Sequence, residues 1–142
     1  MSNILGWFLA IAATAFFLGI SAELSIYIDV VTIVFIIPTV YGLSSVIYDG
    51  RKTLLSIKGI KYLFIAVNTP KEALSNIYLT QIKLTIITSV IGFSAGLMAV
   101  LVNYDPVDSS SIGPELAVLM PLILYPSLII GLIYYPLYKK LA

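Results

Sequence analysis

Four separate runs of apolar residues, each long enough to cross a lipid bilayer, constrain this chain more than any other feature of its sequence. A transmembrane helix needs roughly 20 mostly apolar residues to cross about 30 Å of hydrocarbon. The runs cover about residues 4–20, 30–48, 84–102 and 116–137. With 60% apolar and only 11% charged residues, the chain departs strongly from the composition of soluble domains. The sequence therefore predicts an all-α, four-span transmembrane helical protein in which residues 1–142 form a single membrane domain.

The first run is predicted to be a retained span. No Lys or Arg precedes its apolar stretch, and the polar residues that follow lead directly into the second run. A secretory signal peptide has a basic segment before its apolar core. Cleavage after the first run is the less favoured alternative.

The charged residues indicate how the spans are oriented. All eight basic residues lie between the second and third spans or at the C-terminus: Arg51, Lys52, Lys58, Lys61, Lys71, Lys83, Lys139 and Lys140. Five of the seven acidic residues lie in the other two connections: Glu23, Asp29, Asp105, Asp108 and Glu115. By the positive-inside rule, both termini and the connection 49–83 are cytoplasmic, and the two acidic loops are outside.

The cytoplasmic connection has two parts. Its first part, RKTLLSIKGIKYLFI, mixes Lys with large apolar residues. That pattern fits either a helix in the membrane interface or a cytoplasmic extension of the second span interrupted at Gly59. In the second part, Thr69 is predicted to cap a helix, with Pro70 at its first position and Glu72 completing a capping box. One helix over residues 70–102 would be about 50 Å long, so its first turns would project into the cytoplasm.

Hydroxyl and small residues take the place of ionisable residues inside the third span. No Asp, Glu, Lys or Arg lies near the middle of any predicted span, so the chain alone is a poor proton conductor and a titrating group would come from another chain. At helical spacing the third span carries Thr85, Thr88, Ser89, Gly92, Gly96 and Ala99. Such a stripe either packs closely against another helix or lines a narrow polar passage.

Proline interrupts the fourth span repeatedly, at Pro121, Pro126 and Pro136. Proline removes a helix hydrogen bond and bends the helix, so we expect a bent fourth span, with a flexing gate as the alternative. The end of this span carries a predicted interfacial anchor, formed by Tyr134, Tyr135 and Tyr138 beside Lys139 and Lys140.

Several classes of function are excluded by what the sequence lacks. It contains no Cys and no His, which excludes disulfides, thiolate nucleophiles, the usual zinc sites and Ser-His catalysis. The formal net charge of +1 provides no broad basic surface for nucleic acid. No span groups a nucleophile with a base, so we expect no catalytic residues, no metal and no cofactor.

Three segments share a pattern with a known family. In IYIDVVTIVFIIPTVYG an Ile-Asp pair precedes a small hydroxyl residue and a glycine, at Asp29, Thr32 and Gly42; in IITSVIGF, Thr88 and Ser89 precede Gly92. The third segment, SIGPELAVLMPLILYPSLIIGLIYYPLYKKL, includes Ile112, Gly113, Pro114, Ala117, Val118, Tyr125 and Pro136. Over residues 4–62 and 82–142, the chain resembles the MotA/TolQ/ExbB family of ion-driven motor subunits, and especially its flagellar-stator branch.

The resemblance implies a partner and an assembly. Five copies of such a subunit would surround two single-span helices of the MotB or ExbD kind, which carry an intramembrane Asp, in the bacterial inner membrane. Ions would pass between the third and fourth spans and the partner helix, with Ser89, Thr85 and Thr88 along the path. Gly92, Gly96 and Ala99 would allow close helix packing.

The chain also departs from the family pattern. The connection 49–83 is much shorter than the cytoplasmic domain of flagellar members, Ile82 stands where the family has proline, and Leu122 or Ile123 stands at the threonine of the ion path. The resemblance thus implies an ion-channel or stator subunit that couples ion flow to mechanical work. The alternative is a non-conducting membrane scaffold derived from the same family.

Overall fold

The described part of the chain is helical and contains no strand. The computed structural model describes residues 2–21, 29–65, 67, 69, 71–104 and 112–142. The α-helices are α1 (Ser2–Ser21), α2 (Val30–Tyr48), α3 (Gly50–Gly59), α4 (Glu72–Val102), α5 (Ile112–Leu119), α6 (Pro121–Ile129) and α7 (Tyr135–Leu141). A short 3₁₀ helix, η2 (Ile60–Leu63), follows α3, and a π-helical segment, η4 (Ile130–Tyr134), joins α6 to α7.

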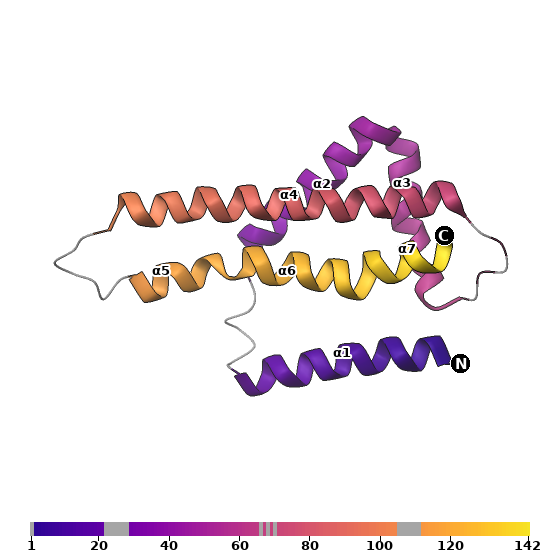
Figure 1. Cartoon of the computed structure of the whole chain (residues 1–142), viewed down its shortest axis with the longest axis horizontal. Coiled ribbons are helices and arrows are strands. Elements are labelled where there is room, and N and C mark those ends of the chain that lie inside the picture. Colours follow the sequence, from indigo (N-terminus) through magenta and orange to yellow (C-terminus); the bar gives the residue numbers. More distant parts are fainter. Residues whose placement is uncertain (1, 22–28, 66, 68, 70, 105–111) are drawn as a thin grey trace.

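Three helices are long and apolar enough to cross a membrane: Val30–Tyr48, Glu72–Val102 and the helical segments of Ile112–Leu141 taken together. A shorter apolar helix covers Ile4–Ile20. The all-α prediction is confirmed, and the three long helices are compatible with a multi-pass membrane protein; the count of four spans stays a prediction. The start of α1 and the C-terminus lie at the same end of the molecule (Figure 1).

An antiparallel pair of long helices forms the centre of the structure. Helix α4 runs beside α5, α6 and α7, whereas α2 crosses α4 at an angle and α1 lies on the opposite side of the pair (Figure 1). One end of this pair carries Lys71, Lys139 and Lys140 and is named the Lys-rich end. At this end, the Ser75 hydroxyl donates to the Tyr138 carbonyl at 3.0 Å. There the Lys71 N–H also donates to the Leu141 carbonyl at 2.9 Å. The ends of α4 and α7 are therefore joined directly.

Helix α4 confirms the long third helix but begins later than the capping box predicts. Its first residue is Glu72, its N-cap is Lys71, and no side chain caps it. The predicted capping by Thr69 is therefore wrong, and Pro70 lies outside the described residues. The Lys71 N–H bonds to α7 instead of a local cap, so tertiary contact fixes where the helix starts.

The connection from α2 to α3 is a sharp corner at Asp49. This residue has φ 71°, a conformation that ends a right-handed helix. Its carboxylate accepts the Gly50 N–H at 2.7 Å and so caps α3. Helix α3 then folds back beside α2 and α4 (Figure 1). A continuous extension of the second span as far as Gly59 is therefore contradicted.

Small polar side chains are buried as often as apolar ones in the described residues, and many large apolar side chains are exposed. Among the described residues the buried polar side chains are Thr32, Ser44, Thr53, Ser56, Ser75, Gln81, Thr85, Thr88 and Ser89. On α3, Thr53 and Ser56 are buried, whereas Leu54 and Leu55 are 59% and 54% exposed. Apolar side chains on the outside are stable when the surroundings are hydrocarbon, so the distribution is consistent with the interfacial interpretation of α3.

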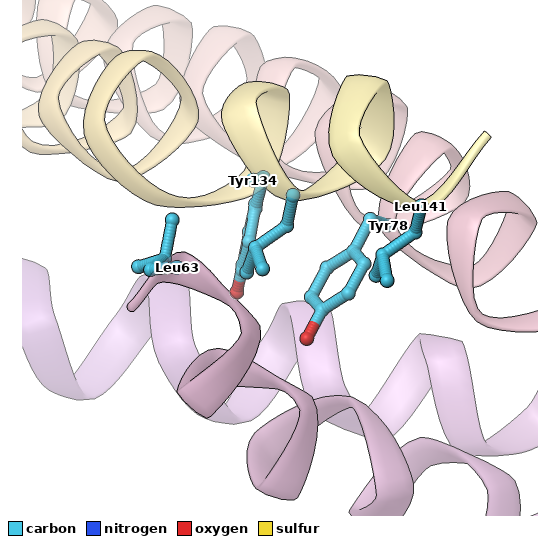
Figure 2. Close-up of a cluster of buried hydrophobic side chains, with 5 residues drawn as sticks. Leu63, Tyr78, Tyr134 and Leu141 are labelled. Carbon is cyan, nitrogen blue, oxygen red and sulfur yellow. The ribbon is translucent and has the colours of Figure 1, made fainter. Parts of the chain in front are cut away.

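A cluster of buried apolar side chains lies where η2, α4, η4 and α7 meet (Figure 2). It comprises the buried side chains of Leu63, Tyr78, Tyr134, Leu137 and Leu141. The rings of Tyr78 and Tyr134 are 6.1 Å apart, and the Tyr134 hydroxyl donates to Tyr41 at 3.4 Å. The prediction that Tyr134 belongs to an interfacial anchor is therefore wrong, because its ring fills the space between α4 and η2. Tyr135, in contrast, is exposed.

A hydrogen-bonded cluster attaches α3 to α4. The Tyr78 hydroxyl donates to the Ser56 carbonyl at 2.5 Å, and the Gln81 amide donates to the Ser56 hydroxyl at 2.9 Å. That hydroxyl in turn donates to the Thr53 carbonyl at 2.7 Å. Buried polar groups gain most when they are paired in this way, so the small polar residues of α3 determine which of its faces lies against α4.

Two of the three prolines of the fourth apolar run coincide with a change in helix geometry, whereas Pro126 lies inside α6. Met120, before Pro121, separates α5 from α6, and the wider η4 segment ends immediately before α7, in which Pro136 lies. In η4 the Tyr135 N–H bonds to the Ile130 carbonyl, five residues earlier. Such a π-turn accommodates a proline ring that would otherwise crowd the preceding carbonyl. The prolines therefore interrupt regular α-helix geometry at two places, and the predicted bend of this span stays a prediction.

A proline also leaves unpaired the carbonyl four residues before it. In this structure all three of these carbonyls have other donors: the Met120 N–H for Ala117, the Ser89 hydroxyl for Leu122 and the Trp7 indole N–H for Leu132. The Trp7 indole nitrogen lies 2.8 Å from the Leu132 carbonyl oxygen. The Trp7 ring also packs edge-on against the Phe64 ring, with 4.9 Å between the ring centroids. Because most other side chains of α1 are exposed, Trp7 is a principal attachment of that helix.

We predict that Trp7→Phe lowers the free energy of unfolding by about 1 kcal/mol, because it leaves the Leu132 carbonyl without its donor. In a Pro136→Ala background a backbone N–H becomes available to Leu132, so the same substitution should cost less than half as much. Unfolding by SDS in mixed micelles measures both values. An equal cost in the two backgrounds would contradict the coupling, and Phe8→Leu on the exposed face of α1 is the control.

Candidate functional site

Two of the three predicted ion-path residues, Thr85 and Thr88, lie on α4 and are buried within the chain. Thr85 is 1% exposed and Thr88 is 2% exposed. The Thr85 hydroxyl donates to the Gln81 carbonyl at 2.7 Å, within its own helix. In a single copy of the chain these two threonines therefore lie behind the surface that another helix would touch.

Ser89 lies at the boundary between α4 and α6. Its hydroxyl donates to the Leu122 carbonyl, which Pro126 leaves without a helix partner. A hydroxyl has two acceptor lone pairs in addition to its proton. Ser89 therefore has a structural role and can still accept one hydrogen bond or offer its oxygen to a cation.

An outward-facing groove lies between α4 and α6 and includes Ser89. It has a volume of about 300 Å³. Two further hydroxyl residues line it, Ser94 and Ser127, along with the apolar side chains of Ile86, Val90, Phe93, Ile123 and Ile130 and with Pro126. Ser94 and Ser127 do not belong to the predicted ion path. Their spacing within each helix gave no sign of a shared groove, because only helix pairing brings the two positions together.

The glycines of α4 differ in what surrounds them. A Cβ on Gly92 would lie 2.8 Å from the Phe35 ring and 2.9 Å from Leu122, so α2 and α6 both approach this position. A Cβ on Gly96 would meet the tip of Leu119. Ala99 is exposed, and its carbonyl accepts the Asn103 N–H at 3.2 Å. The structure therefore places Gly92 and Gly96, but not Ala99, in close contacts within the chain.

Three residues of the family pattern form a cluster where α2 begins. Asp29 caps α2, accepting the Val31 N–H at 3.0 Å and the Thr32 hydroxyl at 2.5 Å. The Asp29 N–H donates to the Tyr125 hydroxyl at 2.6 Å. The cluster explains these residues as a helix cap joined to α6.

This cap lies beside the central part of the long helix pair and not at one of its ends (Figure 1). Tyr125 lies near the middle of Ile112–Leu141, and α2 begins beside the central part of the long helix pair (Figure 1). The physical reason is the crossing angle of α2, which sets its first residue opposite the middle of a longer helix.

The remaining residues of the family pattern lie apart from that cluster. Gly42 is exposed, and a Cβ added there would meet nothing within 4 Å. Gly113 and Pro114 are in the first turn of α5. Pro136 lies in α7, four residues beyond the Leu132 carbonyl that Trp7 binds. Ile28 lies outside the described residues.

Within the described residues, no group of three His, Cys, Asp or Glu side chains is placed to hold a metal ion. The chemistry that the α4–α6 groove can offer is that of neutral hydroxyl oxygens in an apolar setting. Comparison with protein-family models, curated proteins and solved structures finds no match to this chain.

We predict that Gly59→Ala destabilises the protein more than Gly96→Ala does. A Cβ on Gly59 would lie 2.5 Å from the Tyr78 hydroxyl, which is held by Ser56, whereas the Leu119 tip beside Gly96 can rotate away. We expect a cost of about 2 kcal/mol at Gly59, typical of overpacking. Thermal unfolding in detergent measures both variants. The control is Gly42→Ala, which should be neutral or slightly stabilising; a cost there equal to that at Gly59 would contradict the packing argument.

Proposed function

We propose that the chain is a ring-forming subunit of the MotA/TolQ/ExbB type in the bacterial inner membrane, where it couples ion flow to mechanical work. The observation that carries this proposal is the outward-facing α4–α6 groove, in which hydroxyls lie among apolar side chains. A single-span partner helix with an intramembrane Asp would lie along this groove. The apolar lining suits a transmembrane helix, and the hydroxyls suit a polar group on it.

The ion path in this proposal runs along the groove. Ser89, Ser94 and Ser127 provide its oxygen atoms, because they line the groove. Thr85 and Thr88 are buried behind it and would support α4 without touching the ion. The Asp of the partner would supply the titrating group, since the groove lining itself contains no acidic residue.

A second candidate is a non-conducting scaffold that holds a partner helix in the same groove. Two hydrogen bonds favour it. The Ser89 hydroxyl already serves the Leu122 carbonyl, and the Ser127 hydroxyl donates to the Ile123 carbonyl at 2.7 Å. In a scaffold the groove would be dry, whereas in a conducting subunit it would be wet.

Thiol accessibility distinguishes these two candidates, because the sequence contains no Cys. In native membranes we expect Ser94→Cys to react with a membrane-impermeant methanethiosulfonate, since reaction needs a water-exposed thiolate. Ala95→Cys, an exposed neighbour outside the groove, should react at least tenfold more slowly. If neither variant reacts, the groove is dry and the scaffold is favoured; equal reactivity would contradict a water path confined to the groove.

The assembly state is a separate test. From the family resemblance we expect native mass spectrometry of the detergent-solubilised protein to show particles with five copies of this chain. A monomer or a dimer would contradict the ring. Because this measurement does not depend on ion flow, it tests the assembly whichever result the thiol experiment gives.

A further inference from the structure

A second cavity, at the Lys-rich end of the molecule, plays no part in the proposed ion path. It has a volume of about 770 Å³ and lies between α3, η2 and the first turns of α4. Four lysines line it: Lys52, Lys58, Lys61 and Lys83. No Asp or Glu is among its lining residues, so its charge is strongly positive.

Apolar walls and polar groups accompany these lysines. Leu55, Leu74 and Ile77 belong to the walls. Tyr48 and Thr80 also line the cavity, and their hydroxyls are hydrogen-bonded to each other at 2.8 Å. A ligand that fits this cavity has a multiply accepting anionic head and an apolar body, because lysine ammonium groups bind phosphates as point charges.

The nearest described acidic residues do not neutralise the cavity. Asp49 follows Tyr48 in sequence, but its carboxylate caps α3 through the Gly50 N–H. Glu72 precedes Ala73 at the start of α4 and is exposed outside the lining. The four lysines therefore remain available to an anion.

The position of the cavity indicates where such a ligand would come from. Leu54 and Ile57 of α3 are exposed beside it, as expected for a helix at the membrane surface. The positive-inside rule places this end of the molecule at the cytoplasmic leaflet. That leaflet carries anionic lipids, and basic pockets between transmembrane helices on this side bind their headgroups.

We propose that this cavity binds the phosphate of an anionic phospholipid, with its ammonium groups on the headgroup and its leucine and isoleucine walls on the glycerol and upper acyl chain. Occupation would fix α3 and η2 against the first turns of α4. This site is independent of the α4–α6 groove, so it stands or falls separately from the proposed function.

Native mass spectrometry with defined lipids tests this proposal on the chain of residues 1–142. We expect dioleoyl phosphatidylglycerol to bind and dioleoyl phosphatidylcholine, with the same tails, to bind at least tenfold more weakly. The double variant Lys58→Gln, Lys83→Gln should weaken phosphatidylglycerol binding by about 25-fold, or about fivefold for each lysine near the membrane surface. Restoring charge with Lys58→Arg and Lys83→Arg should keep most of the affinity.

A matched control separates the cavity from general surface charge. Arg51→Gln with Lys139→Gln removes the same net charge at residues outside the cavity lining and should change binding less than threefold. Equal loss in both double variants, or equal binding of the two lipids, would overturn the site. Glycerol 3-phosphate is the probe for a soluble source: if it binds as tightly as the lipid, the membrane source is overturned. Circular dichroism confirms that each variant is folded.

Discussion

Backbone carbonyls within hydrocarbon need donors from the protein, and the prolines of Ile112–Leu141 make this the requirement on which the rest of the structure depends. Each proline removes one donor. Trp7 of α1 supplies the donor for Leu132, and Ser89 of α4 supplies the donor for Leu122. Two other helices are thus attached to the proline-containing helix at the points where it lacks its own hydrogen bonds.

The same polar groups place limits on function. The Ser89 hydroxyl is fixed in position because it donates a hydrogen bond to the Leu122 carbonyl. This bond stabilises the helix contact and also holds the Ser89 oxygen beside the α4–α6 groove. The neighbouring threonines of α4 face inward. An ion passage along this chain would therefore use Ser89 and Ser94, which line the groove, whereas the buried Thr85 and Thr88 would hold the helices together.

The Lys-rich end of the molecule is organised differently from the middle. Here large side chains form a true core, which contains Tyr78 and Tyr134 (Figure 2). Small polar residues of α3 bind to α4 through Ser56. This combination holds α3 along the surface of the helix pair and leaves a basic cavity beside it. The middle of the molecule provides hydroxyl chemistry, and this end provides positive charge.

Composition and periodicity alone determined the helical class, the bounds of α2, the length of α4 and the interruption of the fourth apolar run near two of its prolines, because each depends on local apolar length or on proline. Tertiary structure decided the start of α4, the burial of Tyr134 and the meeting of Ser94 and Ser127 in one groove. These features depend on contacts between residues far apart in the chain. In a membrane sequence such contacts leave little trace, because the residues that face lipid are as apolar as those that face a neighbouring helix.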